Sequence, residues 1–215
     1  VRGFPRLISI HMHRVGRLNV MLERLENIRT GSTRETVRAR RRQVNLEDFF
    51  EDFTEELDEI MLVDPETESR DHRSRLQIDI DSKHAVSASK SHLTTILQDL
   101  LRNAIMYSMK ATPIKITAQR KGSHIQIDMV DEGYGVREKE VERVFTAFQR
   151  ARQPQIIAEF GYGLSLYLCK HEIEAMNGRM WFESKEGIGS TFSFMLPAWQ
   201  DTPAEAAPSS ADDKP

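Results

Sequence analysis

Two neighbouring stretches with alternating apolar residues constrain the fold most strongly. PIKITAQR (113–120) and HIQIDMV (124–130) are separated only by KGS. A period of two predicts half-buried strands, and such a short connection predicts an antiparallel hairpin. The stretch SHLTTILQDLLRNAIMYS (91–108) repeats apolar residues at helical spacing. The chain is therefore expected to be α+β, a two-layer sandwich of helices on a mixed sheet, and not a doubly wound parallel sheet.

Further elements are expected on both sides of this centre. We expect a helix over 45–62 with Asn45 as its N-cap, and another that is entered through glycines and ends at Asn177-Gly178. The other expected elements are strands at 76–80, 179–185 and 190–197 and a helix at 138–148. Residues 150–160 have no clean periodicity.

The N-terminal part reads as a separate unit. Residues 6–29 predict an amphipathic helix with the stripe Leu7, Ile10, Val15, Leu18, Leu22, Leu25 and Ile28. An arginine-rich linker is expected over 31–42, a globular body over 43–199 and a disordered tail over 200–215.

Composition excludes several classes of protein. The formal net charge of −3 does not favour a nucleic-acid partner. The sequence has no apolar run of about 18 residues and no signal peptide. Because it starts at Val1, we expect a piece of a longer chain, whose membrane contact would come only through missing upstream segments. The single cysteine, Cys169, suits a cytoplasmic location.

Polar residues and glycines recur where expected elements end. Asn103, in DLLRNA, offers an amide oxygen suited to Mg²⁺, although it would also suit a helix surface. In DEGYGV, Asp131 at a strand end can accept a hydrogen bond from an exocyclic amino group. Gly133 and Gly135 would let a flat ring approach the backbone, or would simply form a turn.

Two further motifs follow in order. In VFTAFQR, Phe145 and Phe148 are expected to be buried. Arg150 follows them, near where the phosphates of a bound nucleotide could lie. In FGYGLSL, Gly161 and Gly163 open a helix whose free N–H groups can bind phosphate. The ordered set is much more specific than any single motif.

With these motifs the sequence resembles the ATP-binding catalytic domain of sensor histidine kinases, within the wider family of gyrase, mismatch-repair and heat-shock chaperone ATPases. DLLRNAIMYS resembles the N box of that family, DEGYGV the G1 box, VFTAFQR the F box and GYGLSL the G2 box. The resemblance covers about 43–197 and implies the Bergerat ATPase fold. Residues 14–30 resemble the second helix of the dimerisation hairpin, which implies a homodimer.

The resemblance also implies roles for individual residues. Asn103 would bind Mg²⁺ and Asp131 the adenine amino group, while Tyr107 would lie against adenine or ribose. Residues 150–160 would form the ATP lid. The remaining implied ATP-binding residues are Gly133, Gly135, Arg150, Gly161, Gly163 and Leu164.

Three positions depart from the family pattern. Asp99 stands where asparagine is usual, Met106 where lysine is frequent, and Ser165 replaces a glycine. An added carboxylate and a lost cation both disfavour a bound triphosphate. Asp99 also stands where related hydrolytic ATPases carry a water-activating acid.

The implied activity is transfer of the γ-phosphate of Mg·ATP to a histidine, for relay to a response-regulator aspartate. None of the seven histidines matches the acceptor pattern, so the acceptor is expected outside this sequence. Two alternatives stay open. One is a degenerate module with weak or no ATP binding, and the other is a related ATPase or serine kinase.

Overall fold

The computed structural model describes residues 4–57, 73–108, 112–154, 156 and 161–200. A five-stranded sheet in the order β2-β4-β5-β7-β6 forms one layer. Its strands are β2 (Leu76–Asp79), β4 (Ile114–Lys121), β5 (His124–Asp131), β6 (Arg179–Lys185) and β7 (Gly189–Pro197). β2 runs parallel to β4, and the other pairs are antiparallel, so the sheet is mixed.

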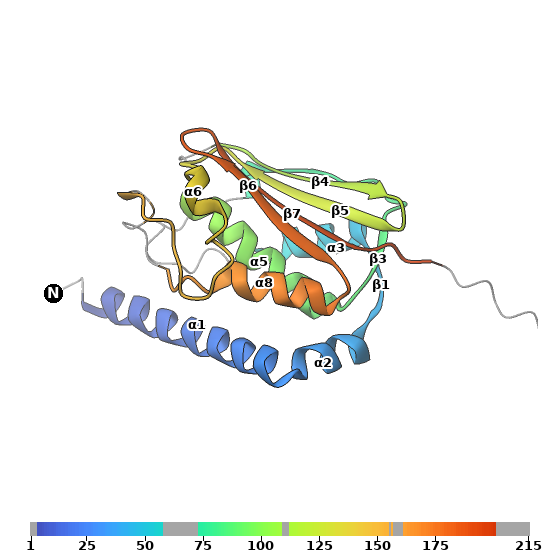
Figure 1. Cartoon of the computed structure of the whole chain (residues 1–215), viewed down its shortest axis with the longest axis horizontal. Helices are drawn as coiled ribbons and strands as arrows, with labels where there is room; N and C mark the ends of the chain where they lie inside the picture. The colour runs from blue at the N-terminus through green and yellow to red at the C-terminus, as the bar shows by residue number, and fades with distance from the viewer. Residues whose placement is uncertain (1–3, 58–72, 109–111, 155, 157–160, 201–215) are drawn as a thin grey trace, which may run out of the picture.

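Helices cover one face of the sheet (Figure 1). They are α3 (Leu46–Glu55), α5 (Lys90–Tyr107) and α8 (Ser165–Ala175), and the short α6 (Glu138–Val141) lies near one end. A 3₁₀ turn at Arg73–Arg75 leads into β2, and β1 (Arg42–Asn45) pairs with β3 (Ala85–Ala88) in a separate ladder. The expected helix-on-mixed-sheet arrangement is confirmed.

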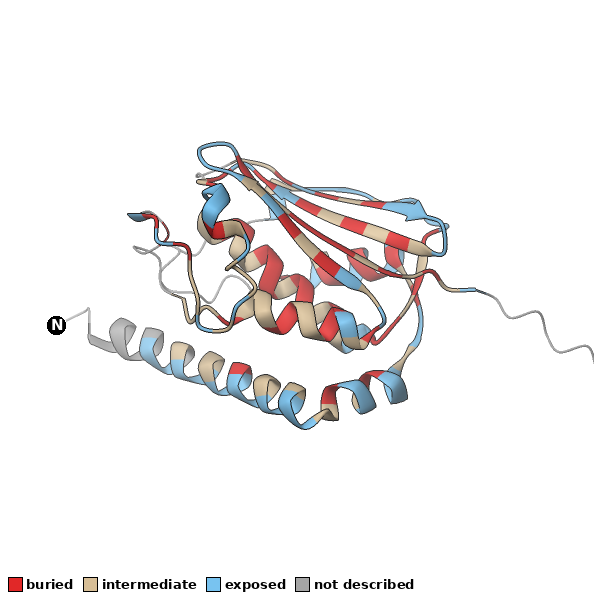
Figure 2. Cartoon of the chain, viewed as in Figure 1, coloured by how far each residue is buried: buried red, intermediate tan, exposed pale blue. Residues whose placement is uncertain are grey.

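The core lies between the sheet and these helices (Figure 2). Inward residues of β4 and β5 such as Ile116 and Ile127 are fully buried, as are Leu97 and Leu100 of α5. Phe50 of α3 closes one end of the same core. Alternate burial along β4 and β5 follows from the period of two in the sequence.

A helical arm lies on the far side of α5 and α8 from the sheet (Figure 1). α1 (Phe4–Thr30) is the helix expected over 6–29, and α2 (Ser32–Arg40) follows it. Gly31 separates them with a φ of 83°, in the left-handed region where glycine has no steric penalty. The arginine-rich segment, expected as a linker, is thus helical, and it buries Val37.

Several expected boundaries were wrong for local backbone reasons. The helix expected over 161–178 begins only at Ser165, because Gly163 has a φ of 69° and does not fit a right-handed helix. The helix expected over 138–148 keeps only four residues, and Phe148 has a φ of 63°. β1 and β3 were not predicted, since four-residue strands carry little periodicity.

The other boundaries agree more closely. Asn45 caps α3 as expected, with its side chain accepting from the Asp48 backbone N–H at 3.2 Å. The rest of the helix expected up to residue 62 and the tail after 200 lie largely outside the described residues. Within the described part of the chain, no helix combines the length and the apolar character that a membrane crossing needs.

Candidate functional site

A pocket opens where the end of α5, the loop after β5 and the segment before α8 meet α1. The expected site residues in its wall are Asn103, Met106, Tyr107, Asp131, Gly135, Arg150, Gly161, Gly163 and Ser165. These residues come from four separate stretches of sequence. The structure therefore brings together most of the residues that the motifs single out.

Asp131 ends β5 with its side chain in the pocket wall. The residue is only 3% exposed, and its Oδ1 has no hydrogen-bond partner among the described residues. Burial raises the pKa of Asp131 to about 7, opposed by a hydrogen bond from the Ser190 backbone and by the charge of Arg75. An unsatisfied buried acceptor is costly, so this oxygen is suited to a donor on a ligand.

The two glycines after Asp131 are required by the packing of the chain. A Cβ on Gly133 would lie 2.2 Å from the carbonyl oxygen of Tyr107, and one on Gly135 would lie 2.0 Å from that of Lys185. Gly135 lines the pocket and has a φ of 58°. Gly133 lies against the backbone of Tyr107. The Tyr107 carbonyl also accepts a hydrogen bond from the Tyr134 N–H at 3.0 Å. Space for a flat ring is thus not the sole reason for glycine here.

The last turns of α5 supply the next wall. Asn103, Met106 and Tyr107 all line the pocket, as spacings of three and four place residues on one helix face. The Tyr107 hydroxyl accepts from Nη2 of Arg150 at 3.4 Å, and Arg150 also donates to the carbonyl of Ile156. Arg150 therefore joins α5 to the segment after the F-box-like motif.

The glycine-rich entry to α8 also lines the pocket. A Cβ on Gly161 would make only ordinary contacts at 3.5 Å, whereas one on Gly163 would lie 2.7 Å from the carbonyl of Gln149. Ser165, the first residue of α8, lines the pocket. Leu164 is fully buried against Met21 of α1 and Leu168, so its position favours a packing role.

Asp99 does not line the pocket, although it lies on α5 one turn before Asn103. Its carboxylate accepts from Nη1 of Arg24 at 2.6 Å and from Nη2 of Arg17 at 3.4 Å. The Arg24 guanidinium also binds both carboxylate oxygens of Glu172, each at 2.8 Å. The charge of Asp99 is therefore compensated by α1, which sequence reasoning did not predict.

α1 itself contributes to the pocket through Arg14, Arg17 and Met21. The Tyr162 hydroxyl donates to the Arg14 carbonyl at 2.7 Å, which fastens α1 to the glycine-rich segment. The only sequence signal was the set of arginines between the apolar positions of 6–29, and it resembles an ordinary solvated face.

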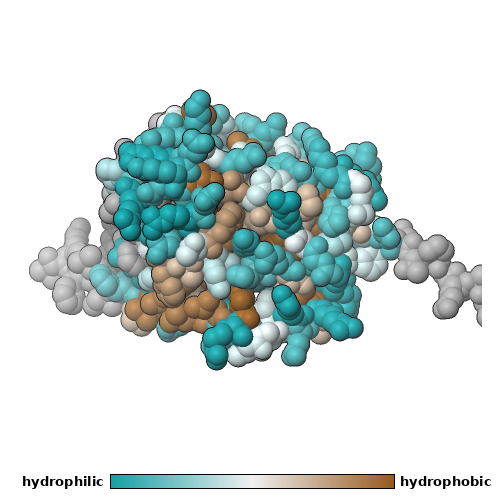
Figure 3. All heavy atoms as spheres, viewed as in Figure 1, coloured by the Kyte–Doolittle hydropathy of each residue, from teal (hydrophilic) through white to brown (hydrophobic). Residues whose placement is uncertain are grey.

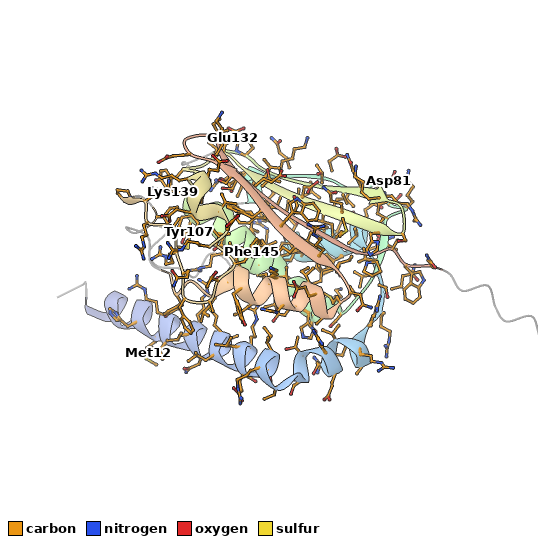
Figure 4. All side chains as sticks on the ribbon, in the orientation of Figure 1. Met12, Asp81, Tyr107, Glu132, Lys139 and Phe145 are labelled. Carbon is orange, nitrogen blue, oxygen red and sulfur yellow. The ribbon has the colours of Figure 1, made fainter. Side chains whose placement is uncertain are left out.

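The expectation for Phe148 was wrong. This residue is 60% exposed, whereas Phe145 is partly buried against the core and lies 5.3 Å below the Lys170 ammonium. Figure 4 shows Phe145 and Tyr107 in the interior below the sheet. The expected lid, 150–160, lies partly outside the described residues.

Comparison with known proteins identifies the family. Residues 88–200, more than half of the chain, match the family model described as histidine kinase-, DNA gyrase B- and HSP90-like ATPase. The chain belongs to this ATPase family. The matched range contains all four motif stretches but neither α1 nor α2.

Curated relatives of this ATPase domain are sensor kinases. The chain is 36% identical over 123 residues to the sensor-like histidine kinase SenX3 of Mycobacterium tuberculosis, covering 57% of this chain and 30% of the relative. It is 34% identical over 116 residues to the adaptive-response sensory kinase SasA of Prochlorococcus marinus, covering 53% and 30%. The chain thus spans about a third of the length of these relatives. These matches identify it as the ATP-binding catalytic domain of the sensor histidine kinase type.

A solved structure shares the fold over a longer range. The Acinetobacter baumannii histidine kinase AdeS superposes with a TM-score of 0.64 at 18% identity, covering 86% of this chain and 79% of that one. The shared fold is the mixed sheet with helices on one face.

The pocket fits the nucleotide that an ATPase domain binds. Asp131, whose Oδ1 is unsatisfied, lines the pocket, and so do the arginines 14, 17, 102 and 150. A neutral polar base and an anionic phosphate chain need this combination of an acceptor and cations. ATP binding is consistent with both the family and the wall.

Proposed function

We propose that this chain is the part of a sensor histidine kinase that binds Mg·ATP and presents its γ-phosphate to a histidine outside the sequence. The single observation that carries the proposal is Asp131, a residue of the pocket wall with a buried and unsatisfied carboxylate oxygen. A histidine phosphorylated in this way would pass its phosphoryl group to a response-regulator aspartate. The relatives, named as sensor kinases, support this class of reaction.

Asp131 would accept a hydrogen bond from the adenine amino group, and Tyr107 would lie against the adenine or ribose. Gly161 and Gly163 would bind phosphate oxygens through backbone N–H groups. Bound Mg·ATP would supply the transferable phosphoryl group. The protein would act mainly by positioning and by neutralising charge.

Mg²⁺ would be held by the Asn103 amide oxygen together with the phosphates. Among the described residues, no cluster of three or more histidine, cysteine or acidic side chains could hold a metal. Magnesium commonly uses few protein ligands together with substrate phosphates, so a single amide fits that pattern.

α1 would be one helix of a dimerisation hairpin, giving a homodimer in the cytoplasm. The domain division into 1–30, 31–42, 43–199 and 200–215 belongs to the same proposal. Met12, Val15 and Leu22 are exposed large apolar residues on α1, which supports it.

A degenerate module without nucleotide binding is the alternative, based on Asp99, Met106 and Ser165. Its strongest ground is weakened because Asp99 is compensated by Arg24 and Arg17. The family match does not favour it.

Calorimetric titration with adenosine and with ATP plus Mg²⁺ tests the proposal. Asp131→Asn is expected to lower the affinity for both ligands about tenfold or more, because a hydrogen bond to a charged group contributes about 1.5–3 kcal/mol. Asp128→Asn is the matched control, since Asp128 lies on the same strand and accepts from Gln126 at 2.9 Å.

Equal affinities of wild type and Asp131→Asn for adenosine would contradict the adenine assignment. No binding of either ligand to the wild type would support the degenerate alternative. Phosphoryl transfer is tested separately. A dimerisation domain that carries the acceptor histidine is added together with labelled ATP, and acid-labile label on that domain is measured.

A further inference from the structure

We propose that Arg17 of α1 binds the triphosphate of the nucleotide, so that the ATP site is completed by a helix outside the ATPase domain. The inference rests on the proposed function for the identity of the ligand. It adds a ligand-binding residue beyond the matched range 88–200 and makes nucleotide affinity depend on the docking of α1.

The first step is that α1 is fastened beside the pocket. Arg24 bridges Asp99 of α5 and Glu172 of α8 through contacts of 2.6–2.8 Å, and all three side chains are at most 13% exposed. Met21 packs with Leu164 and Leu168 of the α8 region. Buried, geometrically close ion pairs hold one orientation of two elements, because breaking them leaves uncompensated charges.

The second step is that this docking puts Arg17 in the pocket wall. Arg17 precedes Arg24 by seven residues, two helical turns, so both lie on the face of α1 that meets the domain. Arg17 lines the same pocket as Asn103, Gly161 and Gly163, the residues expected near the phosphates. Its side chain is 23% exposed, compared with 13% for Arg24, so it is more accessible to a ligand.

The third step is that Arg17 can exchange its contact with Asp99 for a contact with phosphate. Asp99 has two arginine partners, Arg24 at 2.6 Å and Arg17 at the longer distance of 3.4 Å. When Arg17 turns to a phosphate, Asp99 keeps its shorter contact with Arg24. Arginine suits this role because its planar fork of donors binds phosphate oxygens bidentately.

The fourth step is the missing cation at position 106, which Arg102 and Arg150 of the same pocket wall do not occupy. Met106 lines the pocket without a charge, at the position where the resemblance led us to expect a lysine. A triphosphate with one Mg²⁺ keeps a net negative charge, so a cation from a neighbouring element restores the balance. Arg17 can supply that cation.

The test is calorimetric affinity of Arg17→Gln for adenosine, AMP, ADP and ATP with Mg²⁺. The expected loss grows along this series, from within twofold for adenosine to about tenfold for ATP, equivalent to about 1.4 kcal/mol. Arg38→Gln on α2 removes the same charge from an exposed position and is expected to keep wild-type affinities.

Three outcomes would overturn the inference. They are an equal loss for adenosine and ATP, an unchanged ATP affinity, and a gain in ATP affinity, which would mean that α1 competes with the phosphates. Arg17→Lys keeps the charge and is expected to lose less ATP affinity than Arg17→Gln, which provides a second variant if the latter is unstable. Adenosine binding by wild type and its loss in Asp131→Asn report on the proposed function independently of this result.

Discussion

Asp131 is buried at the end of β5, with one carboxylate oxygen unsatisfied and its pKa raised to about 7. The cause is burial, which penalises the charged form more than the Ser190 hydrogen bond and the Arg75 charge favour it. A hydrogen-bond donor on a bound ligand would offset the cost of burying the carboxylate. The residue identity was predictable from DEGYGV, but its protonation follows from burial in the folded chain.

This raised pKa predicts a pH dependence of stability. The pKa is near 4 in the unfolded chain and about 7 in the folded one, so the folded state binds more protons between these values. The free energy of unfolding without nucleotide should therefore fall as pH rises from about 4 to about 7, by at most about 1.4 kcal/mol per pH unit from this group. Denaturant unfolding at several pH values measures it.

Asp131→Asn should remove this component of the slope, because the amide does not titrate. Adenosine should restore stability above pH 7, where the carboxylate is ionised and can accept the amino-group hydrogen bond. The same slope in wild type and variant would show that Asp131 keeps an ordinary pKa.

At the scale of elements, buried ion pairs as well as apolar contacts hold α1 against α5 and α8. Arg24 lies between Asp99 and Glu172, and desolvation opposes its charge while the two carboxylates raise its pKa above the ordinary arginine value. Asp99, which looked like a defect of the site, is a docking residue for α1 in this structure. Glu172 is only 3% exposed and depends on the same arginine.

Arg24→Met is therefore expected to release α1. It removes the arginine partner of buried Glu172 and leaves Asp99 with only the longer contact to Arg17. Breaking a buried ion pair in this way costs about 3–5 kcal/mol if the elements stay together. Undocking of α1 relieves this cost, so amide hydrogen exchange should accelerate along α1 and change little in β4 and β5.

Arg29→Met is the control, because the pair of Arg29 with Glu26 is exposed and lies within α1. The triple change Arg24→Met, Asp99→Asn and Glu172→Gln should recover part of the protection, since no buried charge remains. Unchanged exchange in Arg24→Met would mean that apolar packing alone holds the helix.

At the scale of the whole molecule, α1 has a second apolar face. Met12, Val15 and Leu22 are 68%, 55% and 43% exposed, and Val15 and Leu22 are two helical turns apart. Figure 3 shows hydrophobic spheres gathered where α1 lies in Figure 1, and Figure 4 shows Met12 pointing away from the body. This outer face would pair with a second hairpin in the proposed homodimer.

Light scattering over a range of concentrations tests whether the outer face of α1 mediates dimerisation. The wild type should gain mass with concentration, and the double change Val15→Lys and Leu22→Lys should stay near the monomer mass, because lysines oppose apolar burial. Val20→Lys is the control, since Val20 is 54% exposed at a different angle around the helix. A wild type that stays monomeric at high concentration would contradict the pairing.

The sequence alone determined the layers and most of the pocket. Period-two stretches and apolar helix spacing are local, so β4, β5 and α5 were predictable, and glycine and aspartate motifs marked Asp131, Gly135 and Gly163. Local backbone geometry limited the prediction of helix boundaries, since the positive φ of Gly163 delays the start of α8 to Ser165. α6 ends already at Val141, well short of the expected residue 148.

Only the tertiary structure decided what α1 does. The ion pairs of Arg24 and Arg17 with Asp99 join residues 75 and 82 positions apart, and no local pattern encodes such a pairing. An arginine on an amphipathic helix has the same sequence signature whether it faces water or a buried carboxylate. The difference is desolvation, which exists only once the helix has docked.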